Sequence, residues 1–112
     1  TSQGKLFLAY MPEAERRSIL SQAKLEPYTP LTITSPEALN RELLLIRSQG
    51  YAIENGEYKT GLRSVSAPIF DHAGAVPYAI GIIGMFRQIE SEQFSRATRV
   101  VVETAQKISK AL

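Results

Sequence analysis

The sequence predicts an α+β domain with an antiparallel sheet and flanking helices. One observation is the helical spacing of apolar residues near the end of the chain, and a second is the strand-like alternation of side chains between residues 62 and 70. A third is the order of the elements: helices first, then three short strands grouped together, then a last helix. Strands that are grouped, and that do not alternate with helices, are typical of an antiparallel sheet with helices packed on it.

The composition fits one globular domain. The chain has 112 residues, of which 44% are hydrophobic and 21% charged, as in ordinary folded domains. The formal net charge is +2 and the basic residues are scattered, which argues against a nucleic-acid surface within this chain. It has no cysteine and one histidine, so disulfides and thiolate metal sites are excluded. No apolar run could span a bilayer, and we expect a cytoplasmic protein without a cofactor, a metal site or a membrane partner.

Two short helices are predicted at the start of the chain. The hydroxyls of Thr1 and Ser2 can cap a helix over residues 4–10, because they accept hydrogen bonds from the free amides of a first turn. Pro12 suits the start of a second helix, where no amide donor is needed. The segment LEPYTPLTIT carries two prolines, which indicates an extended connector.

A longer helix is predicted for residues 36–49. Ser35 stands before a proline and a glutamate at its start, and Thr34 with Glu37 also fits a capping box. Gly50 supplies the left-handed end. The buried stripe repeats every three or four residues and consists of Leu39, Leu43 and Ile46.

Three strands are predicted next, over residues 51–54, 62–70 and 75–85. Asn55-Gly56 is a turn dipeptide, and the last two strands pair as a hairpin. In the second strand, apolar residues alternate with Ser64, Ser66 and Pro68. Because three strands make a narrow sheet with an open edge, we expect the natural domain to have further strands, preceding Thr1.

The last helix is predicted to begin at Ser91-Glu92. Its apolar residues recur at helical spacing: Phe94, Ala97, Val101, Val102, Ala105, Ile108 and Leu112. This apolar face must pack on the sheet or on a partner subunit.

Two motifs in these elements resemble a known family. The opening SQGKLFLAYMPEAER looks like a G-K-x-x-L-A-x-x-P-E segment, and LLLIRSQGYAIENGEYKTGLRSVSAPIFDHAG follows a pattern R-x-x-G-Y-x-x-[DE]-x-x-E-x-x-x-G-[LV]-R-x-[VI]-[AS]-[AV]-P-[VI]-F-D-x-x-G. Both are similar to the effector-binding domain of IclR-type bacterial transcription regulators, over essentially the whole chain. The resemblance implies a GAF-like fold, ligand-controlled DNA binding, and dimers that pair into tetramers. It also implies that residues 1–112 are the C-terminal part of that domain, without its helix-turn-helix.

The resemblance further implies a site for a small carboxylate effector. Backbone amides at Ser2 and Gln3 would hold the carboxylate, with Gly4 allowing close approach. A helix start favours this, since its free amides and the positive end of its dipole attract an anion. The alternative is that Ser2 only caps its helix.

Other site residues implied by the resemblance lie on the strands. Glu54 matches an acidic residue that accepts from the effector; the alternative is a solvated charge beside a turn. Leu62 and Ser64 match pocket-wall positions, and a buried Ser64 requires a hydrogen-bond partner. Glu57 is expected to support its loop or to pair with Arg63.

Gly81 and Ile83 depart from the family, which commonly has hydroxyl residues at both positions. Losing two hydroxyls removes polar contacts, and Gly81 is expected to open space where a side chain would be. We therefore predict an effector that is larger or less polar than glyoxylate or pyruvate and still carries one carboxylate. His72, alone in a hairpin loop, is expected to be a surface residue.

We expect a sensing domain and no catalytic residue. One alternative is an enzyme acting on small acids with Glu54 or Glu57 as base, but the sequence lacks a nucleophile beside a base and lacks a metal set. Another is an oligomerisation module whose interface includes Val101 and Ile108. The predicted partners are a small carboxylate effector, further copies in a homodimer or homotetramer, and DNA only through a domain outside this chain.

Overall fold

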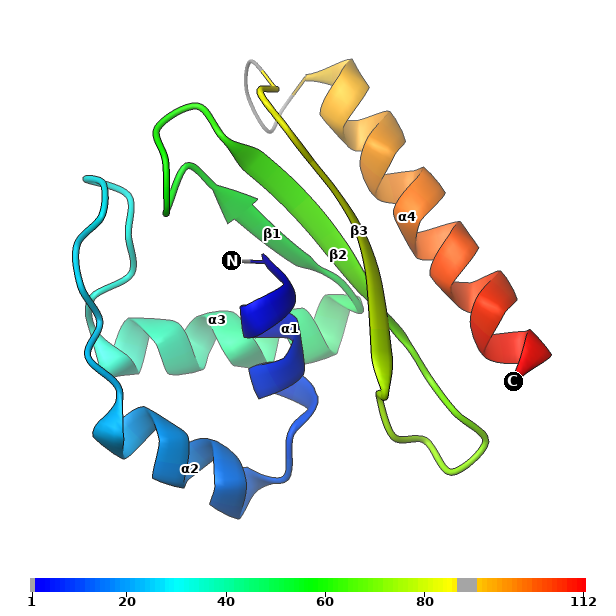
Figure 1. Ribbon diagram of the computed structural model, residues 1–112, viewed down its shortest axis with the longest axis horizontal. Helices are drawn as coiled ribbons and strands as arrows, with labels where there is room; N and C mark the ends of the chain where they lie inside the picture. The colour runs from blue at the N-terminus through cyan, green and yellow to red at the C-terminus, as the bar shows by residue number, and fades with distance from the viewer. Residues whose placement is uncertain (1, 87–90) are drawn as a thin grey trace.

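The structure is a computed structural model that describes residues 2–86 and 91–112 (Figure 1). The elements are α1 (Ser2–Tyr10), α2 (Glu13–Gln22), α3 (Pro36–Gln49), β1 (Ala52–Asn55), β2 (Arg63–Ile69), β3 (Tyr78–Gly84) and α4 (Glu92–Ala111). This order confirms the predicted α+β class and each predicted element. The third strand begins later than expected, at Tyr78, and the connector before α3 contains no helix or strand.

The sheet has three antiparallel strands in the order β1-β2-β3, with β2 in the centre. Glu54 lies opposite Ser64 across β1 and β2, and Ser66 lies opposite Gly81 across β2 and β3. Figure 1 shows α4 along one side of the sheet and α1, with α3 against it, on the other side. In the part of the chain that the structure describes, the outer edge of β3 has no strand beside it.

The two sides of the sheet have separate cores. Successive side chains of a strand point to opposite faces, so Val65 and Ala67 of β2 face α4 while Ser64 and Ser66 face α1. The core under α4 comprises Val65, Ala67, Ile69, Phe94, Val101 and Ala105. The core on the other side comprises Leu6, Ala9, Leu39, Leu43, Ile46 and Ala52. The apolar face of α4 therefore packs on the sheet, which was one of its two expected partners.

Serine hydroxyls cap the two longest helices. The Ser91 hydroxyl accepts from the Phe94 amide at 3.2 Å, and the Ser35 hydroxyl accepts from the Ala38 amide at 3.2 Å. The cap of α3 is thus Ser35 and not Thr34, and Glu37 accepts from the Ser35 hydroxyl at 2.9 Å. The predicted cap of α1 by Thr1 lies outside the described residues.

Gly50 ends α3 in the left-handed conformation, with φ of 88°, as predicted. Its amide donates to the Ile46 carbonyl at 2.8 Å, and this reversal leads the chain directly into β1. Among the helices described, none has the length and apolarity needed to cross a membrane.

Candidate ligand-binding site

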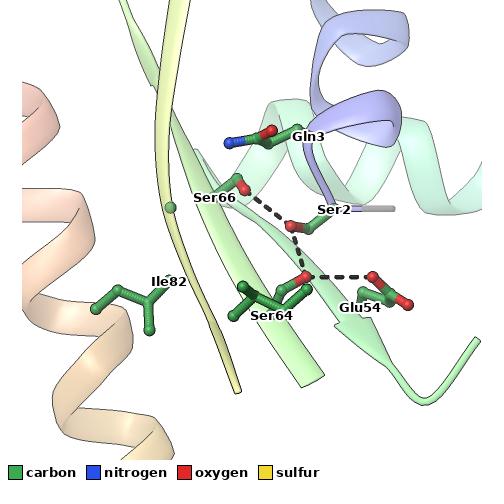
Figure 2. A pocket seen from close by; sticks show the side chains of 8 residues that line it. Ser2, Gln3, Glu54, Ser64, Ser66 and Ile82 are labelled. Carbon is green, nitrogen blue, oxygen red and sulfur yellow. Dashed lines mark hydrogen bonds between the residues drawn. The ribbon is translucent and has the colours of Figure 1, made fainter. Parts of the chain in front are cut away.

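A cavity of about 170 Å³ lies between the first turn of α1 and the face of the sheet opposite α4 (Figure 2). This volume is below the ~300–1,000 Å³ of pockets that hold drug-sized molecules, so the cavity suits a small ligand. Its walls come from α1 and all three strands. The lining residues are Ser2, Gln3, Glu54, Ser64, Ser66, Gly81, Ile82 and Ile83.

A chain of hydrogen bonds runs along one wall of the cavity (Figure 2). The Ser2 hydroxyl lies 2.8 Å from the Ser66 hydroxyl and 2.8 Å from the Ser64 hydroxyl, which lies 3.3 Å from Glu54 Oε1. All four side chains are buried, with Glu54 only 1% exposed. The Ser2 hydroxyl is thus bonded to the strand serines, and the alternative that Ser2 serves only as a helix cap is wrong.

Glu54 connects the cavity to the loop between β1 and β2. Its Oε2 accepts from the Tyr58 amide at 3.2 Å, so the carboxylate fixes the loop with one oxygen and the serine chain with the other. The alternative of a solvated charge beside a turn is wrong, because Glu54 is buried. A buried carboxylate needs such donors, since an unpaired one would be costly.

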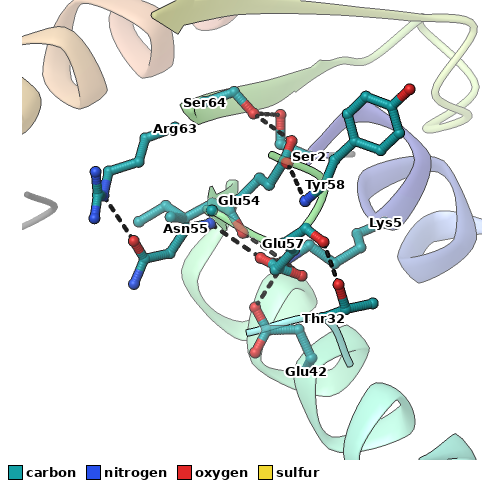
Figure 3. A network of polar contacts seen from close by, with 12 residues as sticks. Ser2, Lys5, Thr32, Glu42, Glu54, Asn55, Glu57, Tyr58, Arg63 and Ser64 are labelled. Atoms are coloured by element: carbon teal, nitrogen blue, oxygen red, sulfur yellow. Dashed lines mark hydrogen bonds and ion pairs between the residues drawn. The ribbon is translucent and has the colours of Figure 1, made fainter. Parts of the chain in front are cut away.

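A second polar network lies next to the cavity and is centred on Lys5 (Figure 3). The Lys5 ammonium donates to the Ile53 carbonyl at 2.5 Å and pairs with Glu57 at 3.0 Å and Glu42 at 3.4 Å. Lys5 is buried, so this network ties α1 to α3 and to the β1–β2 loop. No part of this pairing was predicted from the sequence.

Glu57 supports its loop, which was one of its two predicted roles. Its Oε2 accepts from the Asn55 amide at 3.0 Å, and its ion partner is Lys5. The other predicted role, pairing with Arg63, is wrong. Arg63 instead donates to Asn55 Oδ1 and to the Phe86 carbonyl, both at 2.7 Å.

The structure brings together six of the eight residues predicted for the site: Ser2, Gln3, Glu54, Ser64, Gly81 and Ile83. Gly4 and Leu62 are not among the lining residues. Leu62 precedes β2, and its backbone carbonyl and amide bond to Gly56 and Lys59 of the loop. His72 is exposed, as expected, in the turn after β2.

Sequence reasoning missed Ser66 and Ile82 as lining residues. A signal for Ser66 was present, because it stands two residues after Ser64 and so shares its face of the strand. Ile82 gave no such signal, and Figure 2 shows its side chain pointing away from the serines, toward α4. Across residues 2–86 and 91–112, no group of three or more acidic or histidine side chains could hold a metal ion.

The cavity and its fold can be compared with known proteins. The protein family described as "Bacterial transcriptional regulator IclR C-terminal" matches residues 1–110. The chain belongs to this family. The IclR resemblance inferred from the two motifs is thereby confirmed.

Named IclR-type relatives and solved structures agree. The transcriptional regulator BhcR of Paracoccus denitrificans is 35% identical over 106 residues, which are 95% of this chain and 38% of that protein. RhmR of Escherichia coli, an uncharacterized regulator, is 37% identical over 97% of this chain and 42% of that protein. The crystal structure of the Thermotoga maritima IclR superposes with a TM-score of 0.89 at 41% identity, over 100% of this chain and 45% of that one. The chain thus spans less than half of these proteins.

Gly81 of this IclR domain does not open space in the cavity. A Cβ atom at this position would lie 2.5 Å from the Ser66 hydroxyl oxygen and 2.7 Å from the Val65 carbonyl oxygen. Glycine in a strand often marks such a close approach of a neighbour. The predicted extra space is therefore wrong, which removes one of the two grounds for expecting a larger or less polar effector; the other ground, the missing hydroxyls at Gly81 and Ile83, stays a prediction.

Ser66 occupies the volume that a side chain at position 81 would take. The two residues are cross-strand partners on the same face of the sheet. Ser66 thus supplies a hydroxyl on β2 directly opposite Gly81. Ile83, 62% exposed, leaves the second hydroxyl position apolar and lies where the cavity opens along β3.

Proposed function

We propose that this IclR C-terminal domain senses a small organic acid, which binds in the cavity between α1 and the sheet. The observation that carries the proposal is the row of buried polar side chains at Glu54, Ser64, Ser2 and Ser66 on an otherwise core-facing surface. Burying polar groups is costly, and a domain built only for stability would gain more from apolar residues here. A cavity that keeps these groups beside it is suited to recognising a polar ligand.

The first turn of α1 supports an acid as that ligand. The amides of a helix start have no partner within the helix and carry the positive end of its dipole. Ser2 and Gln3 lie at this turn and line the cavity. We propose that the acid's carboxylate lies against this turn and that its body reaches toward Ile83.

The complete protein is proposed to be a cytoplasmic transcription regulator that does not act as an enzyme. Relatives that extend well beyond the matched part are named as regulators, and one, AllR of Klebsiella pneumoniae, as a repressor; it is 34% identical, and this chain covers 40% of it. In the described residues, Glu54 is the sole acidic or basic group lining the cavity. DNA binding through a separate domain, and a homodimer or homotetramer whose assembly responds to the acid, complete the proposal.

A thermal-shift screen tests the proposal with the complete protein. The panel contains keto acids, hydroxy acids, sugar acids and aromatic acids, each beside its amide or alcohol. A ligand present at about a hundred times its Kd adds about 2.7 kcal/mol to the free energy of unfolding, which is a readily measured shift. The proposal fails if no acid in the panel raises the melting temperature.

Two serine variants place the binding in this cavity. Ser64→Ala removes the hydroxyl between Ser2 and Glu54, and we expect it to weaken acid binding roughly tenfold. Ser95→Ala makes the same chemical change at an exposed position on α4 and should leave binding unchanged. Equal affinities in the two variants would place the acid elsewhere.

A further inference from the structure

The cavity contains one carboxylate and is proposed to accept a second. Glu54 is 1% exposed, and its oxygens bond to Ser64 and to the Tyr58 amide. Within the described residues, no lysine, arginine or histidine lines the cavity. Two carboxylates that share a small site do not both ionise at low cost, because each charge disfavours the other.

The charged groups on α1 and α3 leave this repulsion in place. The Lys5 ammonium lies against the Ile53 carbonyl, but its ion pairs are with Glu57 and Glu42. One cation beside two carboxylates has a net negative charge. This cluster therefore disfavours a second anion next to Glu54.

The titratable side chains on β2 and on the β1–β2 loop also do not supply a positive charge to the cavity. Arg63 donates to Asn55 Oδ1 and to the Phe86 carbonyl, and it leaves β2 on the face opposite Ser64. Tyr58 offers Glu54 its amide, while its side chain is 49% exposed. A proton is thus the simplest positive charge that an acid could bring with it.

The serine chain can transmit the protonation of Glu54 into the cavity. A hydroxyl has one hydrogen and two lone pairs, so Ser64 can donate either to Glu54 or to Ser2, and not to both. With Glu54 ionised, Ser64 donates to Glu54 and not to Ser2, and the Ser2 hydroxyl accepts from Ser66, in a contact in which either oxygen can be the donor. The hydrogens of Ser64 and Ser66 then both point along the chain toward the carboxylate, and Ser66 offers a ligand only lone pairs.

Protonation of Glu54 reverses this chain. The acid hydrogen is donated to Ser64, Ser64 donates to Ser2, and Ser2 donates to Ser66 at the same 2.8 Å contact, in which either oxygen can be the donor. The hydrogen of Ser66 is then free. A hydroxyl donating to a carboxylate makes one of the stronger hydrogen bonds in proteins.

We propose that the domain binds its acid together with one proton, which Glu54 holds, and that the chain Glu54–Ser64–Ser2–Ser66 thereby turns the Ser66 hydroxyl toward the acid as a donor. The inference rests on the proposed function, because it assumes an acid in the cavity. It makes Ser66 the residue that distinguishes an acid from a neutral ligand. In the ionised state, the same hydroxyl accepts from ligands that donate.

Titration calorimetry on the complete protein measures the proton directly. Pyruvate, lactate and benzoate serve as probes near neutral pH, each in two buffers of different ionisation enthalpy, with pyruvamide, lactamide and benzamide as neutral controls. We expect uptake of about one proton per bound acid, and an affinity for acids that falls about tenfold per pH unit above neutrality. The amides should bind without uptake.

Two variants separate Glu54 from the other carboxylates. Glu54→Gln donates an amide hydrogen to Ser64 as the protonated acid would, so it should bind acids without proton uptake and without dependence on pH. Glu103→Gln removes an exposed carboxylate on α4 and should keep the uptake of the wild type. The proton count in the wild-type protein needs no variant, so it decides the question even if Glu54→Gln does not fold.

The outcomes distinguish this inference from the proposed function. Acid binding by the wild-type protein with no proton uptake and no pH dependence overturns the inference and leaves the proposed function standing. Failure of both wild type and Glu54→Gln to bind any probe acid between about pH 5 and about pH 9 overturns the proposed function, and the inference with it.

Discussion

The two faces of the sheet are made from the same strands but differ in role: one packs in an apolar core, and the other lines a polar cavity. Toward α4, β2 presents Val65, Ala67 and Ile69, and these pack in a closed apolar core with Phe94. Toward α1, the same strand presents Ser64 and Ser66, which are buried without being apolar and line a cavity. The period of two along a strand lets one face supply stability while its neighbour holds a polar site.

The comparison also explains why the site face can tolerate its polar groups. Each buried hydroxyl has a partner in the chain that ends at Glu54, and Glu54 has a second donor in the Tyr58 amide. A fully connected network costs far less than an unsatisfied one. Apolar burial is supplied both by the core under α4 and by the core that α1 and α3 form on the other side.

The largest expected effect is a loss of stability on the α4 face, where Phe94 is the largest fully buried side chain of the described residues. Phe94 is 1% exposed and packs edge-to-face on Phe86, with ring centroids 5.0 Å apart. Phe94→Ala should reduce the free energy of unfolding by about 3–5 kcal/mol, because it leaves a cavity in the core. Urea unfolding measures the loss, and calorimetry below the transition should show unchanged acid affinity. If Phe94→Ala is still folded at the temperature of the titration but no longer binds acids, the two faces of the sheet do not act separately.

A smaller loss is expected where β2 and β3 approach most closely. Gly81→Ala places a Cβ against the Ser66 hydroxyl and the Val65 carbonyl, and should destabilise the protein by roughly 1–3 kcal/mol while it disturbs the site. Gly84→Ala is the matched control on the same strand, where the new Cβ meets a Phe86 ring atom at 3.4 Å, an ordinary contact. Thermal unfolding of both variants checks this, and equal melting temperatures would contradict the close approach.

Two serines on opposite sides of the sheet provide the sharpest comparison. Ser66→Ala removes a hydroxyl from the site, and Ser109→Ala removes one from α4 that accepts from the Phe70 amide at 2.9 Å. Each should cost about 1 kcal/mol of stability, the usual worth of one hydrogen bond. Only Ser66→Ala should lower acid affinity, by roughly tenfold, in calorimetric titrations. If Ser109→Ala weakens binding equally, the serines act through stability alone.

The periodic and local features of the fold could be predicted from the sequence. Alternation in β2 predicts two unlike faces. The end of α3 at Gly50 and the cap of α4 at Ser91 follow from residue types next to the helix ends. These features depend on contacts a few residues apart, which one sequence displays directly.

The missed features depend on which segments meet in space. That Ser66 lies opposite Gly81 follows from the register of β2 and β3, which residue types alone do not determine. Lys5 reaches Glu57 only because α1 packs beside the β1–β2 loop. Residues close in sequence suggest Arg63 as the partner of Glu57, and that prediction misses a contact between distant segments. Alternation predicts that Leu62 belongs to the strand, whereas its backbone bonds to Gly56 and Lys59 of the loop.

The smallest expected effect compares the starts of the two longest helices, α3 and α4. Glu37 on α3 accepts hydrogen bonds from its own backbone amide and from the Ser35 hydroxyl, and these lower its pKa below the ordinary 4.5. A pKa lowered by folding means that the carboxylate stabilises the fold above the pKa of the unfolded chain, and that this contribution disappears as the pH falls through the folded value. Glu37→Gln should therefore make stability slightly less sensitive to acid in that range, and Glu92→Gln on α4, whose carboxylate pairs with Arg96 at 3.1 Å, is the matched control. Thermal unfolding from about pH 6 to about pH 3 measures both variants, and an acid dependence of Glu37→Gln identical to that of the wild type would show that the cap of α3 holds no charged group.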